Sequence, residues 1–200
     1  MTTTRRFLIG LTGAALLVAA PPRAGAGPND PGYAKAFTCS ACHGYDGASR
    51  SDTVPVLAGM PAWYLKKTIQ DYASGKRPAA EMEPYAKMVL QLGVDDVANY
   101  FAKLPKQPTP LKADPAAVER GRAAATQCTV CHGAAGKGDP AKGVPDLTGQ
   151  PAGYLKAQML LFKTDKRSPG EPSLSALKAL MKTMSDDQFA DLAAFWSSQR

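Results

Sequence analysis

Histidine is scarce in this sequence, with only two in 200 residues, and cysteine occurs four times. A chain so poor in histidine has little material for acid and base catalysis by imidazole. The sequence also lacks long stretches in which apolar and polar residues alternate, the pattern of half-buried strands, so we expect no β-sheet. With 44% hydrophobic and 20% charged residues, the composition is that of a globular protein rather than a disordered chain.

Long apolar runs are absent beyond the N-terminus. Arg5-Arg6 precedes an apolar run over residues 7–20, and Ala-Gly-Ala at 24–26 has the form of a signal-peptidase site. At ~1.5 Å per residue, this run falls short of a hydrocarbon core about 30 Å thick. We therefore predict a cleaved signal peptide over residues 1–26 and an exported mature chain without a transmembrane segment.

The positive charge of the chain is modest once this leader is removed. The leader holds three arginines and no acid, so its removal lowers the formal net charge from +7 to +4. A charge of that size is typical of an ordinary solvated surface, and it indicates neither a nucleic acid nor a membrane as partner.

The mature sequence is a tandem repeat. Residues 39–44 (CSACHG) recur at 128–133 (CTVCHG), and residues 54–66 recur at 144–156 with the shared pattern V-P-x-L-x-G. Gly32 and Gly121 also match, because each stands seven residues before the first cysteine of its repeat. The region between the repeats is rich in proline, which cannot continue a helix and favours an extended linker. We therefore predict a first domain over 27–104, a linker over 105–112 and a second domain over 113–200.

Local patterns predict helices in both repeats. Asp114-Pro115 has the pattern of a helix start, and good helix formers follow over 116–126. Apolar residues recur at helical spacing over 64–72 and 154–162. A capping-box pattern at Ser185–Gln188 opens the last helix. One face of that helix should carry Phe189, Leu192, Ala193 and Trp196.

Each repeat contains Cys-x-x-Cys-His, the signature of covalent haem attachment. The two thiols can each form a thioether with one vinyl group of the haem, while the adjacent imidazole binds the iron. A zinc site is disfavoured, because the cysteines and histidine of one repeat leave a tetrahedral site one ligand short. A thioredoxin-like motif would need a βαβ context, and plain disulfides would leave the histidines unexplained. We therefore predict two covalently bound haem c groups, held by Cys39, Cys42, His43, Cys128, Cys131 and His132.

The sixth iron ligand cannot be a second imidazole, because His43 and His132 are the only histidines. It must be methionine, a rarer ligand such as lysine, or nothing, and methionine raises the reduction potential. A methionine ligand should come from the segment between the middle and last helices of its repeat. That position excludes Met159 and disfavours Met60, whose counterpart in the other repeat is Gln150.

The sequence resembles dihaem cytochromes of the c4 type over essentially the whole mature chain. The resemblance rests on the two C-x-x-C-H-G motifs, the P-x-L-x-G-x-x-x-x-Y-L run after each, Gly-Lys-Arg at 75–77 and the C-terminal D-L-A-A-F-W. It implies an all-α fold of two tandem class I cytochrome c domains joined by a proline-rich linker. It also implies histidine and methionine ligands in each domain, and electron transfer between periplasmic or membrane-bound redox proteins.

The same resemblance implies particular methionine ligands. Residues 81–87 look like the methionine loop of the family, so Met82 is the expected ligand in the first domain and Met88 the second choice. In the second domain the family's position falls on Leu177, which cannot bind iron. Either the loop is rebuilt so that Met181 reaches the iron, or the second haem has a different or missing sixth ligand. We name Met181 as the candidate.

We expect a periplasmic electron carrier rather than an enzyme, with redox proteins as donor and acceptor. The Arg5-Arg6 pair resembles a twin-arginine signal, but haem attachment after export favours the general secretory route. One alternative is a small dihaem oxidoreductase similar to a thiosulfate dehydrogenase or a peroxidase, because an irregular second site could leave an open iron position. A further alternative is a dedicated cytochrome subunit of a larger dehydrogenase or oxidase.

Overall fold

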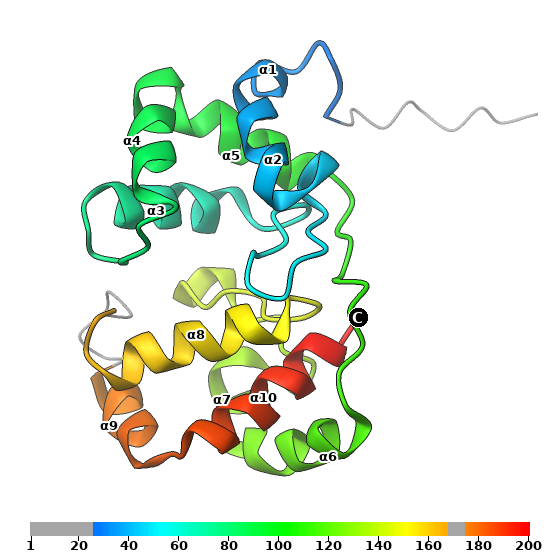
Figure 1. The fold of residues 1–200 in the computed structure, drawn as a ribbon, viewed down its shortest axis with the longest axis vertical. Coiled ribbons are helices and arrows are strands. Elements are labelled where there is room, and N and C mark those ends of the chain that lie inside the picture. Colours follow the sequence, from blue (N-terminus) through cyan, green and yellow to red (C-terminus); the bar gives the residue numbers. More distant parts are fainter. Residues whose placement is uncertain (1–25, 168–174) are drawn as a thin grey trace, which may run out of the picture.

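The computed structural model describes residues 26–167 and 175–200. The predicted signal peptide over 1–26 lies outside these residues, except for Ala26. Figure 1 shows two groups of helices, one above the other, with the chain passing from the first group to the second along one side. The described residues contain no β-strand, only an isolated bridge between Asp139 and Val144. The prediction of an all-helical protein is therefore confirmed.

The two groups have the same order of elements. The first contains α1 (Tyr33–Ala36), α2 (Ser40–His43), α3 (Ala62–Ala73), α4 (Glu83–Leu92) and α5 (Val94–Lys103). The second contains α6 (Pro115–Ala124), α7 (Thr129–His132), α8 (Ala152–Lys163), α9 (Ser175–Thr183) and α10 (Asp186–Ser198). Short 3-10 turns lie at Phe37–Cys39, Tyr45–Gly47, Ala125–Gln127 and Pro140–Lys142.

The helix starts of the second domain follow from their sequence. The Asp114 side chain accepts from the backbone N–H groups of Ala116 and Ala117, and Pro115 occupies the first helical position. The predicted capping box at Ser185 and Gln188 is formed in both directions. The expected apolar face of α10 is buried, with Phe189, Leu192, Ala193 and Trp196 between 0% and 2% exposed.

The first and last helices of each domain pack closely at a glycine. A Cβ atom added at Gly32 would lie 2.2 Å from the Asp96 carbonyl oxygen, and one at Gly121 would lie 1.9 Å from that of Asp191. Any side chain would therefore push the helices apart. This contact explains why the two repeats share a glycine seven residues before the first cysteine.

The segment expected to be the methionine loop of the first domain is mostly helical. Met82 is the N-cap residue of α4, with Glu83 and Pro84 in the first turn. Proline is favoured there because its missing N–H has no partner inside the helix. Ala86 and Val89 of α4 are buried, whereas Met88 is half-buried. In the second domain Met181 likewise lies within a helix, α9, rather than in a loop.

The two domains contact each other through polar groups of the chain. Asp52, in the loop after α2, accepts from the Gly153 N–H through its side chain at 2.9 Å and from the Tyr154 N–H through its carbonyl at 2.8 Å. Gly153 and Tyr154 lie in the first turn of α8, whose N-cap residue, Pro151, makes no side-chain cap. The first domain therefore caps a helix of the second.

The linker is extended and packed against both domains. The Thr109 N–H donates to the Gly149 carbonyl at 2.7 Å, and Thr109 is buried. On the other side, a Cβ atom added at Gly59 would lie 2.6 Å from the Lys106 Cβ. Among the helices described, none is long and apolar enough to span a membrane.

Candidate cofactor-binding site

The two Cys-x-x-Cys-His segments adopt the same local structure. In each, a short helix ends at the histidine, and the glycine that follows takes a positive φ, +78° at Gly44 and +72° at Gly133. The turn after Gly44 is tight, because a Cβ atom there would lie 2.6 Å from the Ala48 carbonyl oxygen. The glycine of the motif thus lets the chain turn away directly after the histidine.

The four cysteine thiols are free and arranged alike in the two domains. The first cysteine of each motif, Cys39 or Cys128, is half-buried, and the second, Cys42 or Cys131, is exposed. Burial raises the pKa of the Cys39 and Cys128 thiols. Within the described residues, no three or more histidine, cysteine or acidic side chains are clustered so that they could hold a metal ion.

Each histidine is oriented by a proline carbonyl. His43 Nδ1 lies 2.8 Å from the Pro55 carbonyl oxygen, and His132 Nδ1 lies 3.1 Å from that of Pro145. A carbonyl can only accept, so Nδ1 carries the proton and Nε2 keeps a lone pair for a metal. Burial lowers the pKa of both histidines, which favours the neutral, ligating form. The repeated V-P-x-L-x-G pattern is visible in the sequence, but nothing in it indicates that its prolines orient the histidines.

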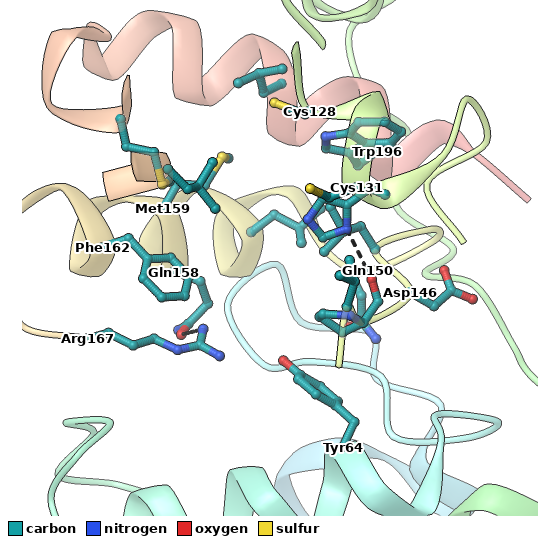
Figure 2. Close-up of a pocket in the computed structure, with 18 of the residues that line it drawn as sticks. Tyr64, Cys128, Cys131, Asp146, Gln150, Gln158, Met159, Phe162, Arg167 and Trp196 are labelled. Carbon is teal, nitrogen blue, oxygen red and sulfur yellow. Dashed lines mark hydrogen bonds between the residues drawn. The ribbon is translucent and has the colours of Figure 1, made fainter. Parts of the chain in front are cut away.

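A cavity of about 220 Å³ opens beside His132. Figure 2 shows Cys128, Cys131 and Trp196 around one part of it, Met159 and Phe162 of α8 farther along, and Tyr64 of the first domain facing it. Its apolar lining comes mainly from α8, α9 and α10 and includes Leu155, Leu177, Leu180, Phe189 and Leu192. A flat apolar ring attached to both cysteines would find apolar neighbours here.

Three methionines of the second domain line this cavity together with His132, namely Met159, Met181 and Met184. Met181 is 7% exposed, and Met184 is half-buried. Leu177 lines the cavity as well. The structure therefore brings Cys128, Cys131, His132 and Met181 to one cavity, as the sequence-based assignment requires, whereas Met82 and His43 of the first domain are not among its lining residues.

Leu177 occupies the place in its repeat that Met82 occupies in the other. Asp96 and Asp191 make the same contact, with Gly32 and Gly121, and Met82 and Leu177 each lie 14 residues before their aspartate. Met181 follows Leu177 by about one helical turn in α9. Met60, disfavoured from the sequence, is buried at the domain contact, where its Sδ accepts from Gln150 Nε2 at 3.3 Å.

Cationic and unpaired polar groups gather beside the cavity. Arg77 is 1% exposed, and it donates to the Tyr154 hydroxyl at 2.6 Å and to Gln158 Oε1 at 3.0 Å. No carboxylate of the described residues pairs with it. Trp63 Nε1, in a cavity-lining side chain, is buried without a hydrogen-bond partner in the described structure. These groups suit an anionic acceptor.

Two arginines act on Tyr64 at the edge of the cavity. Burial alone would raise the pKa of Tyr64, but the charges of Arg77 and Arg167, together with hydrogen bonds to Arg167 and Tyr154, lower that pKa to about 7. A group with an apolar ring, two thiol-reactive substituents, a metal that accepts imidazole and acidic side arms therefore fits the residues present. Haem c has these properties.

Comparison with known proteins agrees with this geometry. A model of the cytochrome c family matches residues 32–104 and again residues 118–199. The chain belongs to the cytochrome c family. Cytochrome c4 of Pseudomonas aeruginosa is 31% identical over 85% of this chain and 88% of its own length. The crystal structure of reduced recombinant cytochrome c4 from Pseudomonas stutzeri superposes with a TM-score of 0.75 at 27% identity, covering 84% of this chain and 97% of that one.

These relatives make the chain a cytochrome c of the dihaem c4 type, so the resemblance and the fold class inferred from its motifs are confirmed. Another relative, the "thiosulfate dehydrogenase electron acceptor" of Thiomonas intermedia, is 34% identical over 98% of this chain and 91% of its own length. Cytochromes c bind haem covalently and transfer electrons through its iron. Electron transfer is therefore the general role of this cytochrome as well.

Proposed function

We propose that this cytochrome carries one covalently bound haem c in each domain and shuttles electrons between redox proteins in the bacterial periplasm. The observation that carries the proposal is the duplicated attachment site. In both domains a short helix presents two thiols and a histidine, buried at His43 and half-buried at His132, whose Nδ1 is fixed by a proline carbonyl. Export is supported by the leader sequence at 1–26, because covalent attachment of this kind follows transport.

The attachment residues are Cys39, Cys42 and His43 in the first domain and Cys128, Cys131 and His132 in the second. When bound, the iron of each haem would supply a reversible one-electron couple. The chain's contribution is to hold and orient the group, and the apolar side chains of the cavity exclude water from it. Arg77, Arg167 and Trp63 would hold its carboxylates. The two arginines have no carboxylate partner among the described residues, and Trp63 Nε1 has no hydrogen-bond partner there.

Met82 and Met181 are proposed as the sixth ligands. Met181 is supported by its position in the same cavity as His132 and by its burial. Met82 is supported by its position as the N-cap residue of α4. There its side chain is not part of the buried face of the helix, which Ala86 and Val89 form. A thioether ligand together with imidazole would give the iron a high potential, which would suit the oxidising part of a respiratory chain.

Exposed apolar residues beside the attachment helices support contact with protein partners. Phe37 and Tyr45 flank the first motif and are 68% and 69% exposed, and Val130 within the second motif is 83% exposed. Aromatic and apolar side chains of this kind are enriched in the core of protein interfaces. Cys42 and Cys131 are also exposed, so an edge of each haem would lie close to the surface.

The haem stoichiometry tests this proposal. The full chain is produced in a bacterial host that attaches haem, and the purified periplasmic fraction is examined by mass spectrometry and by pyridine haemochrome absorbance. We expect two haems per chain and cleavage near Gly27. The paired variants Cys39→Ala with Cys42→Ala, and Cys128→Ala with Cys131→Ala, should each retain one haem. A colourless protein, or one haem on the unaltered chain, would overturn the proposal.

A thiosulfate-oxidising enzyme is a specific candidate for the electron donor. It is favoured by the 34% identical acceptor from Thiomonas intermedia, and by the structure described as thiosulfate dehydrogenase (TsdBA) from Marichromatium purpuratum. This chain matches 36% of that structure with a TM-score of 0.72 at 29% identity. We expect thiosulfate to reduce both haems only when a thiosulfate dehydrogenase is added. Reduction with turnover by thiosulfate alone would instead support the oxidoreductase alternative.

A further inference from the structure

A polar cluster lies directly behind the proximal side of the second site. Asp146 follows Pro145, whose carbonyl accepts from His132. Its carboxylate accepts from the backbone N–H and the hydroxyl of Thr148, at 2.8 Å and 2.7 Å, and lies 2.5 Å from Lys106 Nζ. Lys106 belongs to the linker, so a residue from outside both repeats completes this cluster.

The charges of the cluster are shielded from water. Thr148 is 1% exposed, and the side chains of Asp146 and Lys106 are 16% and 22% exposed. Lys106 Nζ also contacts the Thr148 hydroxyl at 2.8 Å, and Lys137 Nζ contacts the same hydroxyl at 3.0 Å. Charges in such surroundings act on their neighbours more strongly than charges in bulk water.

The first domain has no such charges at the equivalent positions. Val56 takes the place of Asp146, and Ala58 takes the place of Thr148. Val56 is 2% exposed and Ala58 is fully buried. The two histidines therefore have the same proline carbonyl partner but different electrostatic surroundings, apolar behind His43 and charged behind His132.

We propose that Lys106 keeps the reduction potential of the haem on His132 from falling by neutralising Asp146, a control that the haem on His43 does not have because Val56 and Ala58 take the equivalent positions. The proposal rests on the proposed function, since it requires a haem in each domain. An unpaired carboxylate near the iron would stabilise the oxidised, more positive state and lower the potential, and the Lys106 ammonium cancels that effect. Lys106, a residue of the linker, thus acts on the potential of the second haem through Asp146.

Potentiometric titration of the two-haem protein tests this, with each haem followed separately through its own hyperfine-shifted methyl resonances in NMR. Lys106→Met should lower the potential of the second haem alone. The expected size is on the order of a tenfold change in the equilibrium that distributes one electron between the haems, or about 59 mV. Lys106→Arg, which keeps the charge, should restore the original value.

Three further variants sharpen the test. Lys103→Met removes the same charge from the pair with Asp30 in the first domain. It should shift the potential of each haem by less than Lys106→Met shifts that of the second haem. Lys137→Met should have a smaller effect than Lys106→Met, because Lys137 contacts Thr148 rather than the carboxylate. Asp146→Asn, which keeps the side-chain shape, should raise the potential of the second haem. This variant still tests the proposal if the Lys106→Met protein does not fold.

Equal shifts of both haems, or no shift in both Lys106→Met and Asp146→Asn, would overturn the inference. Those outcomes would be seen in a protein that retains two haems. A chain that lacks one or both haems would instead overturn the proposed function, so the two failures are distinguishable.

Discussion

Gln150 of the second domain binds both backbone groups of Val56 in the first. Its Oε1 accepts from the Val56 N–H at 2.9 Å, and its Nε2 donates to the Val56 carbonyl at 2.9 Å. Both residues are 2% exposed. A glutamine in one repeat therefore completes the hydrogen bonding of the other, next to the proline that orients His43.

Replacing Gln150 with leucine should separate the unfolding of the two domains. The change leaves a buried N–H and a buried carbonyl without partners, which costs about 2 to 4 kcal/mol in total. Denaturant unfolding followed by absorbance and circular dichroism should show a lower midpoint and a broader or two-step transition. Gln91→Leu, at an exposed position of α4, is the matched control and should leave the midpoint close to its original value. Equal midpoints for both variants would contradict the assigned role.

Gly121→Ala should destabilise the second domain although alanine is the better helix former. The added methyl group would lie 1.9 Å from the Asp191 carbonyl oxygen, so α6 and α10 would have to move apart. Overpacking of this kind costs about 1 to 3 kcal/mol, more than alanine gains in helix propensity. Thermal melts measure the effect, with Ala123→Ser on the exposed face of α6 as the control. An unchanged or higher melting temperature for Gly121→Ala would refute this packing argument.

Methionine ligation should be visible in the red absorption of the oxidised protein, where a charge-transfer band reports a sulfur-to-iron bond. Met82→Ala and Met181→Ala should each remove about half of the band, and the double variant should remove all of it. Met60→Leu is the control and should leave the band unchanged, because the Met60 sulfur accepts a hydrogen bond from Gln150. If Met181→Ala keeps the full band while Met184→Ala halves it, Met184 is the ligand of the second haem.

Acid should loosen α9 through Asp165. This aspartate pairs with Lys178 and Lys182 of α9 at 2.6 Å each, and these contacts lower its pKa from 3.8 to about 2. A carboxyl group whose pKa is lower in the folded state stabilises the fold above about pH 4, and this contribution is lost as the pH falls towards 2. Hydrogen exchange of the α9 amides should therefore be faster in Asp165→Asn than in the parent at pH 6.

The same difference should shrink strongly as the pH falls through about 2, because Asp165 is then increasingly protonated and the parent loses the charge that Asp165→Asn already lacks. Asp139→Asn removes a carboxylate that pairs with Lys142 in a loop of the same domain, and it should leave α9 unaffected at either pH. A difference for Asp165→Asn that persists undiminished at pH 2 would show that the charge is not responsible.

The sequence predicts the local features well, because they depend on neighbouring residues. The helix start at Asp114, the capping box at Ser185 and the buried face of α10 all appear where the pattern indicates. The identification as a c4-type cytochrome also follows from short motifs, because the chemistry of haem attachment fixes their spacing. The assignment of cysteines, histidines and methionines to two haems stays a prediction.

Features that depend on contact between the repeats are not evident from the sequence. In the sequence, Gln150 is only the residue that stands where the first repeat has Met60. In the structure it forms hydrogen bonds with Val56 and Met60 across the domain contact. The proline carbonyls that orient the histidines are 12 and 13 residues away along the chain, beyond any local pattern. Residues 81–87 were expected to form a loop, but most of them belong to α4 (Glu83–Leu92), whose Ala86 and Val89 are buried.

The cap that Asp52 places on α8 makes the repeats unequal as independent units. A polypeptide severed in the linker would release a second half whose α8 has two amide groups at its start without the acceptors that Asp52 supplies. The corresponding helix of the first half, α3, does not depend on the other domain in this way, because the Tyr64 N–H donates to the Pro61 carbonyl of the same repeat. At this helix, therefore, the first repeat supplies the acceptor for Tyr64 itself, whereas the second repeat depends on the first for two acceptors.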